Sequence, residues 1–177
     1  MTNQNVFNNE NTPLYVQSTS SYLSPEVVSP PEGSAARNGR LFMTTSASTS
    51  VGAGSSLLVQ ITNPSASGRT LYISRISGGV SAAATFNLYS GGTVSGGTTP
   101  TPFNTQLGSS VTSIATARVA TGSVTGSPTV FTTVIVAAGM FTFDFTGAII
   151  VPETRVLTFS IGTGSLTAAA NITWWEA

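Results

Sequence analysis

The amino-acid sequence predicts an all-β domain of antiparallel strands, and two features support this prediction. In residues 141–146 and again in residues 157–161, apolar side chains alternate with threonine, serine or aspartate, which is the two-residue period of a half-buried strand. Gly139, Gly147 and Pro152 separate the apolar segments, and glycine and proline commonly mark the places where a chain reverses. The C-terminal part of the chain is therefore predicted to contain four antiparallel strands.

The first of these four strands has apolar residues on both of its faces. Val130, Val134 and Val136 share one face, and Phe131 and Ile135 share the other. A strand at the surface of a two-sheet domain buries only one face, so Val130, Val134 and Val136 are assigned to a candidate subunit interface. A central strand of a single sandwich explains the pattern equally well, because such a strand is covered on both faces.

More strands are predicted at short, regular spacing along the rest of the chain. Residues 111–119 fit a helical turn or a strand, and a strand is favoured because helix caps and strong helix formers are lacking. Residues 91–110 are rich in glycine, threonine and proline and are predicted to form a long surface loop. Eight or nine strands in total predict an antiparallel jelly-roll sandwich, which occupies residues 37–177 as one head domain. The other predicted strands are 40–46, 57–62, 69–76 and 84–89.

Residues 1–36 differ in composition from the head domain and are predicted to form an extended N-terminal connector arm. Four of the nine prolines lie in this segment, and Pro30 and Pro31 are predicted to form a semi-rigid polyproline II spacer. A disordered tail is the alternative, since it is the default for a polar N-terminus.

Two apolar clusters favour docking of the arm on a neighbouring subunit. Backbone pairing alone does not stabilise such a complex, because ~1 kcal/mol per hydrogen bond is offset by ~1–2 kcal/mol for ordering each residue. Burial of five apolar side chains at ~1.5–3 kcal/mol apiece adds roughly 7–15 kcal/mol, which favours docking. The residues assigned to these arm contacts are Val6, Phe7, Leu14, Tyr15 and Val16.

The chain has few charges, and these are balanced. Six lysine-plus-arginine residues, all of them arginine, oppose six carboxylates, and histidine and cysteine are absent. The arginines are scattered, whereas nucleic-acid binding requires clustered basic residues, so no nucleic-acid partner is predicted. Weak electrostatic repulsion between copies and few charges to protect sheet edges predict self-association.

No membrane attachment is predicted from the sequence. Residues 1–12 have neither a basic segment nor an apolar segment of the kind found in export signals, so no signal peptide is expected. No apolar run approaches the ~20 residues that span a bilayer.

Enzymatic activity is not predicted, and no cofactor or metal is expected. Without histidine, cysteine or lysine the common nucleophile-base pairs, zinc sites and Schiff-base chemistry cannot be built. Asp144 and Glu153 are the carboxylates of the head that lie close in sequence and could act as a pair. Asp144 is expected on the solvated face of a strand, however, and Glu153 in a turn. Trp174 and Trp175 are predicted to point to opposite faces of a terminal strand, one ring in the core and one at a subunit contact. Stacking of the tryptophans on sugars is the alternative.

Four segments together resemble the endospore appendage fibre subunits and other exosporium proteins of Bacillus-type bacteria. They are the arm segment 11–16 (NTPLYV), the entry to the head at 36–42 (ARNGRLF), the segment 71–79 (LYISRISGG) and the ending at 172–176 (ITWWE). The resemblance implies a jelly-roll head, trimeric like the tip domain of the collagen-like exosporium glycoprotein, with an N-terminal connector that docks into the next subunit layer. It also implies a location on the spore surface, with synthesis in the mother cell. Unlike the disulfide-linked appendage pilins, this chain has no cysteine, so a fibre would be held together non-covalently.

The sequence therefore predicts a structural subunit that self-assembles into a spore-surface fibre, with other spore-surface proteins as partners at its base and tip. The alternative is a carbohydrate-binding or virion decoration domain whose arm clamps it to a shell. An enzyme that uses Asp144 and Glu153 is the third hypothesis.

Overall fold

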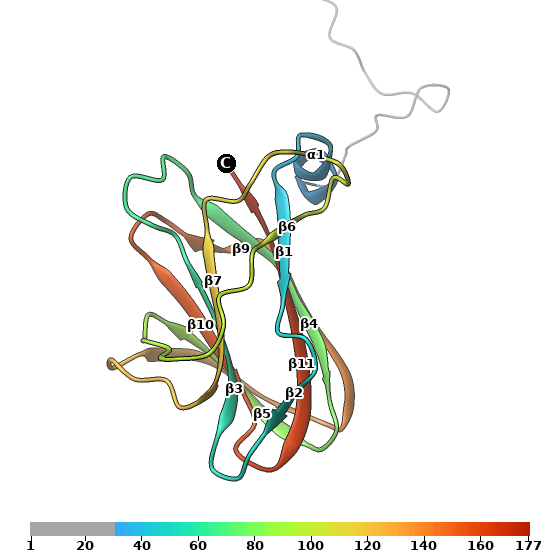
Figure 1. The fold of residues 1–177 in the computed structure, drawn as a ribbon, viewed down its shortest axis with the longest axis vertical. Helices are drawn as coiled ribbons and strands as arrows, with labels where there is room; N and C mark the ends of the chain where they lie inside the picture. The colour runs from blue at the N-terminus through green and yellow to red at the C-terminus, as the bar shows by residue number, and fades with distance from the viewer. Residues whose placement is uncertain (1–30) are drawn as a thin grey trace, which may run out of the picture.

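The computed structural model describes residues 31–177, which form two antiparallel β-sheets packed face to face as a sandwich (Figure 1). The strands are β1 (Leu41–Thr45), β2 (Thr49–Val51), β3 (Ser56–Thr62), β4 (Leu71–Val80), β5 (Ala84–Ser90), β6 (Phe103–Asn104), β7 (Thr116–Gly122), β8 (Thr129–Val136), β9 (Gly139–Val151), β10 (Val156–Ile161) and β11 (Leu166–Glu176); a helix, α1 (Pro31–Arg37), precedes them. The six-stranded sheet has the order β6-β1-β11-β4-β9, with β2 paired to β11, and the five-stranded sheet has the order β7-β3-β10-β5-β8.

The strand order is that of a jelly roll. The strands of the first half pair in turn with those of the second half in reverse order, β1 with β11, β3 with β10, β4 with β9 and β5 with β8. These pairs fall alternately in the six-stranded and five-stranded sheets, so one long hairpin is rolled into two layers. The predicted all-β sandwich is confirmed. The described residues contain eleven strands instead of eight or nine, because β2 and β6 are too short to show alternation.

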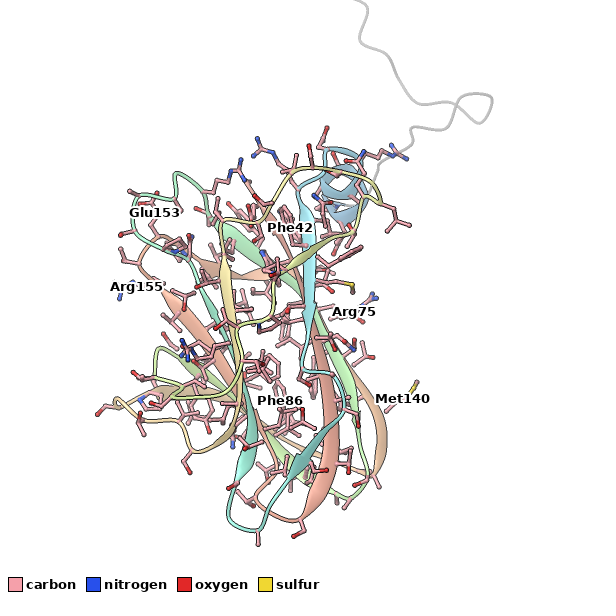
Figure 2. The ribbon with its side chains drawn as sticks, viewed as in Figure 1. Phe42, Arg75, Phe86, Met140, Glu153 and Arg155 are labelled. Carbon is pink, nitrogen blue, oxygen red and sulfur yellow. The ribbon has the colours of Figure 1, made fainter. Side chains whose placement is uncertain are left out.

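The core lies between the sheets and is centred on aromatic rings from both. Phe86 of β5 is 4.6 Å from Phe143 and 6.1 Å from Phe141, both of β9, measured between ring centroids. Its ring is also 5.6 Å from that of Phe159 on β10, and Figure 2 shows Phe86 inside the sandwich. The alternation in 141–146 therefore reports burial against the opposite sheet. The prediction that the strand at 157–161 is half-buried is wrong, because Thr158 and Ser160 are buried as well and β10 is covered on both faces.

The connection between β5 and β8 covers one lateral side of the sandwich. It adds β6 to the edge of one sheet beside β1 and β7 to the edge of the other beside β3, and Figure 1 shows it passing from one sheet to the other. The backbone N–H groups of Thr98 and Val119 donate to each other's carbonyl at 2.8 and 2.9 Å, which occupies part of the free edge of β7. We call this side, bounded by β6 and β7, the closed side.

The predicted loop at 91–110 is thus largely irregular as expected, but the strand predicted at 111–119 begins later, at Thr116. Residues 113–114 are instead fixed by Glu176. The Ser113 hydroxyl and the Ile114 N–H donate to Oε1 of Glu176 at 2.5 and 3.1 Å. This long-range contact, which the local sequence does not show, decides where β7 begins.

The predicted break at Gly147 is wrong, because β9 continues through it to Val151. The pairing of β4 with β9 passes from Ile73–Ile149 to Arg75–Asp144, so four residues of β9, 145–148, bulge opposite Ser74 alone. Gly147 has a φ of +87° at this bulge, and a Cβ atom there would lie 2.2 Å from Cη2 of Trp175. Gly147 therefore shapes a bulge instead of ending a strand.

Pro31 does not lie in a polyproline spacer, which corrects that part of the prediction. It is the first residue of α1, a position that proline favours because its missing N–H has no partner in the first helical turn. Ala35 of α1 is buried, and α1 contacts β1 and β11. The Ser74 hydroxyl of β4 also donates to Oε1 of Glu32 at 3.2 Å. Residues 31–36, which were predicted to belong to the extended arm, are therefore helical and packed on the head.

Candidate assembly surfaces

The lateral side opposite the closed side is bounded by β8 and β9, and we call it the open side. Each of these strands ends its sheet, and each pairs with one neighbouring strand, β8 with β5 and β9 with β4. Apolar side chains of β8 are exposed here, with exposed fractions of 49% for Val130, 47% for Phe131 and 81% for Ile135. A free edge that carries exposed apolar residues is suited to pairing with another chain.

A bulge in β8 corrects the predicted grouping of its valines. Leu88 pairs with Thr132 but its neighbour Tyr89 pairs with Val130, so the register shifts at Phe131. Val130 consequently lies on the outer face of the sheet, as its pairing partner Tyr89 does, and does not share a face with Val134 and Val136. Val134 packs against the core and Val136 is buried. Of the three valines assigned to a subunit interface, Val130 alone lies exposed in the described part of the chain.

A groove of about 290 Å³ opens on the same side, where the ends of β5, β8, β9 and β10 meet. Apolar side chains from both sheets line it, and one cation, Arg155, lies at it beside the exposed Pro152. The two ion pairs of the described residues are Arg69–Glu176 and Arg75–Asp144, so Arg155 takes part in neither. Figure 2 shows Arg155 at the margin of the sandwich on the side away from α1. The apolar residues of the groove are Phe131, Ile149, Ile150, Val151, Val156 and Leu157.

The outer face of the six-stranded sheet carries a second apolar surface. Its register places Leu41, Trp175, Tyr72 and Ile150 in one row across β1, β11, β4 and β9. The rings of Tyr72 and Trp175 are stacked, with centroids 5.5 Å apart and planes inclined by 6°. Ile150 is 53% exposed. The row therefore continues from the groove of the open side onto this face.

Trp174 is a core residue, which corrects its assignment to a subunit interface. Its exposed fraction is 0%, its ring packs 6.4 Å from that of Phe42, and its Nε1 donates to Glu176 at 3.4 Å. Trp175 points to the opposite face of β11 and is partly exposed, so the two rings lie on opposite faces as predicted, and the subunit contact of Trp175 stays a prediction. The placement on opposite faces follows from the alternation of side chains along a strand.

The middle of the outer face of the five-stranded sheet carries polar side chains, whereas β8 at its open-side edge places the exposed Val130 and Ile135 on this same face. The Gln60 amide donates to the Thr158 hydroxyl at 3.0 Å, and Thr133 donates to Oδ1 of Asn87 at 2.7 Å. The hydroxyls of Tyr89 and Ser160 are 3.0 Å apart. Thr158 and Ser160 are themselves buried, so these hydrogen bonds satisfy polar groups that are shielded from water.

The two carboxylates considered for catalysis have partners within the chain. Asp144 pairs with Arg75 on the outer face of the six-stranded sheet. Glu153 accepts a hydrogen bond from the backbone N–H of Gly68 at 2.6 Å. Within residues 31–177 no group of three or more histidine, cysteine, aspartate or glutamate side chains is arranged to hold a metal ion, and no helix there combines the length and apolarity needed to cross a membrane.

The residues assigned to arm contacts, Val6, Phe7, Leu14, Tyr15 and Val16, and the spacer residue Pro30 lie outside the described residues. Sequence reasoning missed two features of the head. Arg155 gave no signal because it is one of several scattered arginines, and Glu176 gave none because its partners are distant in sequence. Comparison of the chain with family models, with curated proteins and with solved structures gives no match.

Proposed function

We propose that this protein is a structural subunit that self-assembles non-covalently, and that its N-terminal residues dock on a neighbouring copy. The observation that carries the proposal is the contrast between a covered closed side and an open side with free strand edges, exposed apolar residues and one cation. Following the resemblance noted above, the assembly proposed is a fibre on the spore surface. Its subunits associate through apolar contact instead of disulfides, because the chain has no cysteine.

Burial of exposed apolar side chains is the main source of free energy for the proposed assembly. Ile150 belongs both to the groove of the open side and to the row containing Tyr72 and Trp175, so these two apolar surfaces meet. Large exposed apolar patches commonly mark interaction sites. Burial of Ile135, Val130 and Ile150 between copies would contribute ~1.5–3 kcal/mol for each side chain that becomes fully covered.

Deletion of residues 2–20 tests the coupling role of the arm. The deleted protein is expected to retain the unfolding curve of the full chain but to remain unassembled by sedimentation velocity and negative-stain electron microscopy. A sharper variant replaces Leu14, Tyr15 and Val16 with serine, and its matched control replaces the polar residues Asn11, Gln17 and Thr19 with serine. The control should assemble as the full chain does. Normal filaments from the deleted protein, or a full chain that stays monomeric, would refute the proposal.

Carbohydrate recognition is the second candidate function, and the partly exposed Tyr72–Trp175 pair favours it. Aromatic rings at a surface supply the apolar faces on which sugars stack. The stacking of Trp175 on Tyr72 covers one face of its ring, however, and Gly147 lies against its edge. Glycan binding by the protein lacking residues 2–20, abolished by Trp175→Ala, would support this function over assembly.

A further inference from the structure

The groove of the open side is suited to an extended apolar segment that also carries a negative charge. It combines apolar side chains such as Phe131 and Ile150 with the guanidinium of Arg155 at its margin. It lies beside free edges of β8 and β9, where backbone groups remain available for pairing. An occupant of matching chemistry has alternating apolar residues and one carboxylate on the same face.

The first 30 residues of the chain contain such a segment. In an extended chain, residues separated by an even number lie on one face, so Glu10, Leu14 and Val16 point the same way. The rise of ~3.3 Å per residue places Glu10 about 13 Å before Leu14. Glu10 and Glu26 are the charged side chains of residues 1–30, whereas all six arginines and the other four of the six carboxylates follow Pro30. The formal side-chain charge is thus −2 for this segment and +2 for residues 31–177.

We propose that the groove between β8, β9 and β10 accepts residues 10–16 of a second copy, with Leu14 and Val16 among its apolar residues and Glu10 paired with Arg155. This assignment rests on the proposed function and names the acceptor site for the arm. Residues 1–30 join the head at α1, which Figure 2 shows on the side of the sandwich away from Arg155. A segment that leaves one copy at α1 can therefore reach the open side of the next copy, and repetition of this contact propagates the assembly.

Disulfide trapping tests the assignment, and the absence of cysteine from the chain leaves no competing thiol. One full-length protein carries Ser18→Cys, which lies on the same face as Leu14 and Val16 without altering them. The second carries Ser90→Cys at the groove, and the matched control carries Ser50→Cys in β2, also exposed. Equal amounts of two single-cysteine proteins are mixed in a glutathione buffer, and the mixed disulfide between chains is followed by non-reducing electrophoresis.

The mixed disulfide with Ser90→Cys is expected to form at least about tenfold faster than that with Ser50→Cys, because docking raises the local concentration of the two thiols. Adding Arg155→Glu to the groove protein should bring the rate down to that of the control. Adding Glu10→Arg to the arm protein should then restore it. Glu10→Arg in the arm protein, mixed with the groove protein that keeps Arg155, should also slow trapping. Because Glu10 lies outside the head, this result does not depend on how well Arg155→Glu folds.

Assembly of the same samples, measured by sedimentation velocity, separates the failure of this assignment from the failure of the proposed function. Assembled chains with equal trapping at Ser90→Cys and Ser50→Cys would overturn the acceptor groove and leave self-assembly intact. Monomeric chains with no trapping above the control would overturn both. A monomeric Ser18→Cys, Ser90→Cys double variant that closes an internal disulfide, while mixtures do not, would show that the arm occupies its own groove and would overturn docking on a second copy.

Discussion

The two lateral sides of the sandwich differ in how the edges of their sheets are protected. On the closed side, the connection between β5 and β8 contributes β6 and β7 and bridges Thr98 to Val119. On the open side, β8 and β9 are joined by a short turn and have no covering segment among the described residues. Proteins generally cover, shorten or charge an exposed edge, and in the proposed assembly another chain covers the open edges.

The difference extends to the use of charge. On the closed side, the buried Glu176 anchors the incoming connection through Ser113 and Ile114 and pairs with Arg69 at 3.0 Å. On the open side, the ion pair of β9, between Arg75 and Asp144, is exposed, and Arg155 is in neither ion pair of the described residues. Electrostatics therefore holds the closed side together within one chain, whereas Arg155 at the open side has no ion-pair partner among the described residues.

The largest expected effect is that of Glu176→Ala, which removes the anchor of the closed side. The free energy of unfolding should fall by about 3–5 kcal/mol, because Arg69 and the donors at residues 113–114 lose a buried partner. Glu176→Gln keeps an acceptor and should cost less, about 1–3 kcal/mol. Urea unfolding followed by tryptophan fluorescence measures both. Equal and small losses for the two variants would show that this network does not stabilise the closed side.

The next effect is that of Gly147→Ala in β9, which tests what stabilises an edge strand that lacks a covering segment. The loss should be about 2–4 kcal/mol, since alanine at φ +87° is strained and its Cβ would collide with the ring of Trp175. Gly54→Ala is the matched control, because Gly54 also has a positive φ, +73°, but no atom within 4 Å of an added Cβ. The control should lose only about 1–2 kcal/mol. Equal losses would contradict the packing of Trp175 on the bulge.

Much of the fold is predictable from the sequence, because burial against the opposite sheet imprints a local pattern. The alternation in 141–146 and 157–161 identifies β9 and β10, and the change of side at each residue of β11 separates Trp174 from Trp175. Such signals need only neighbouring residues. The jelly roll itself is predictable because eight or nine short strands at regular spacing are compatible with only a few antiparallel sandwich folds.

The features that could not be predicted depend on contacts between distant residues. The bulges at Phe131 and at residues 145–148 arise from strand register, and they reverse the face of Val130 and carry β9 past Gly147. The pair of prolines predicts a polyproline segment at Pro31, whereas burial of Ala35 on the head stabilises a helix. The groove itself is formed by the ends of several strands, and a linear pattern does not show that they meet.

A smaller effect is expected for Arg75→Gln, which removes the exposed ion pair of the open-side edge strand. The free energy of unfolding should change by only about 0.2–1 kcal/mol, because water screens this pair. The change should also fade as salt is raised to ~1 M, where the Debye length is about 3 Å. Arg69→Gln, which affects the partly buried pair with Glu176, should cost more at both salt concentrations. A larger loss for Arg75→Gln than for Arg69→Gln would reverse the proposed division of electrostatics between the two sides.

The smallest effect on folding, and the most selective effect on assembly, is expected for Ile135→Lys. Ile135 is 81% exposed on β8, so a lysine there should change the free energy of unfolding by no more than about 0.5 kcal/mol. The charge should nevertheless oppose pairing at the free edge, as edge lysines do in monomeric sheet proteins. Its matched control is Thr121→Lys, at an exposed position of β7 on the closed side. We expect Ile135→Lys to raise the concentration needed for assembly about tenfold, a difference of 1.4 kcal/mol, and Thr121→Lys to leave it unchanged in sedimentation experiments. If both variants weaken assembly equally, a general charge effect explains the loss, and the open side has no special role in the contact between copies.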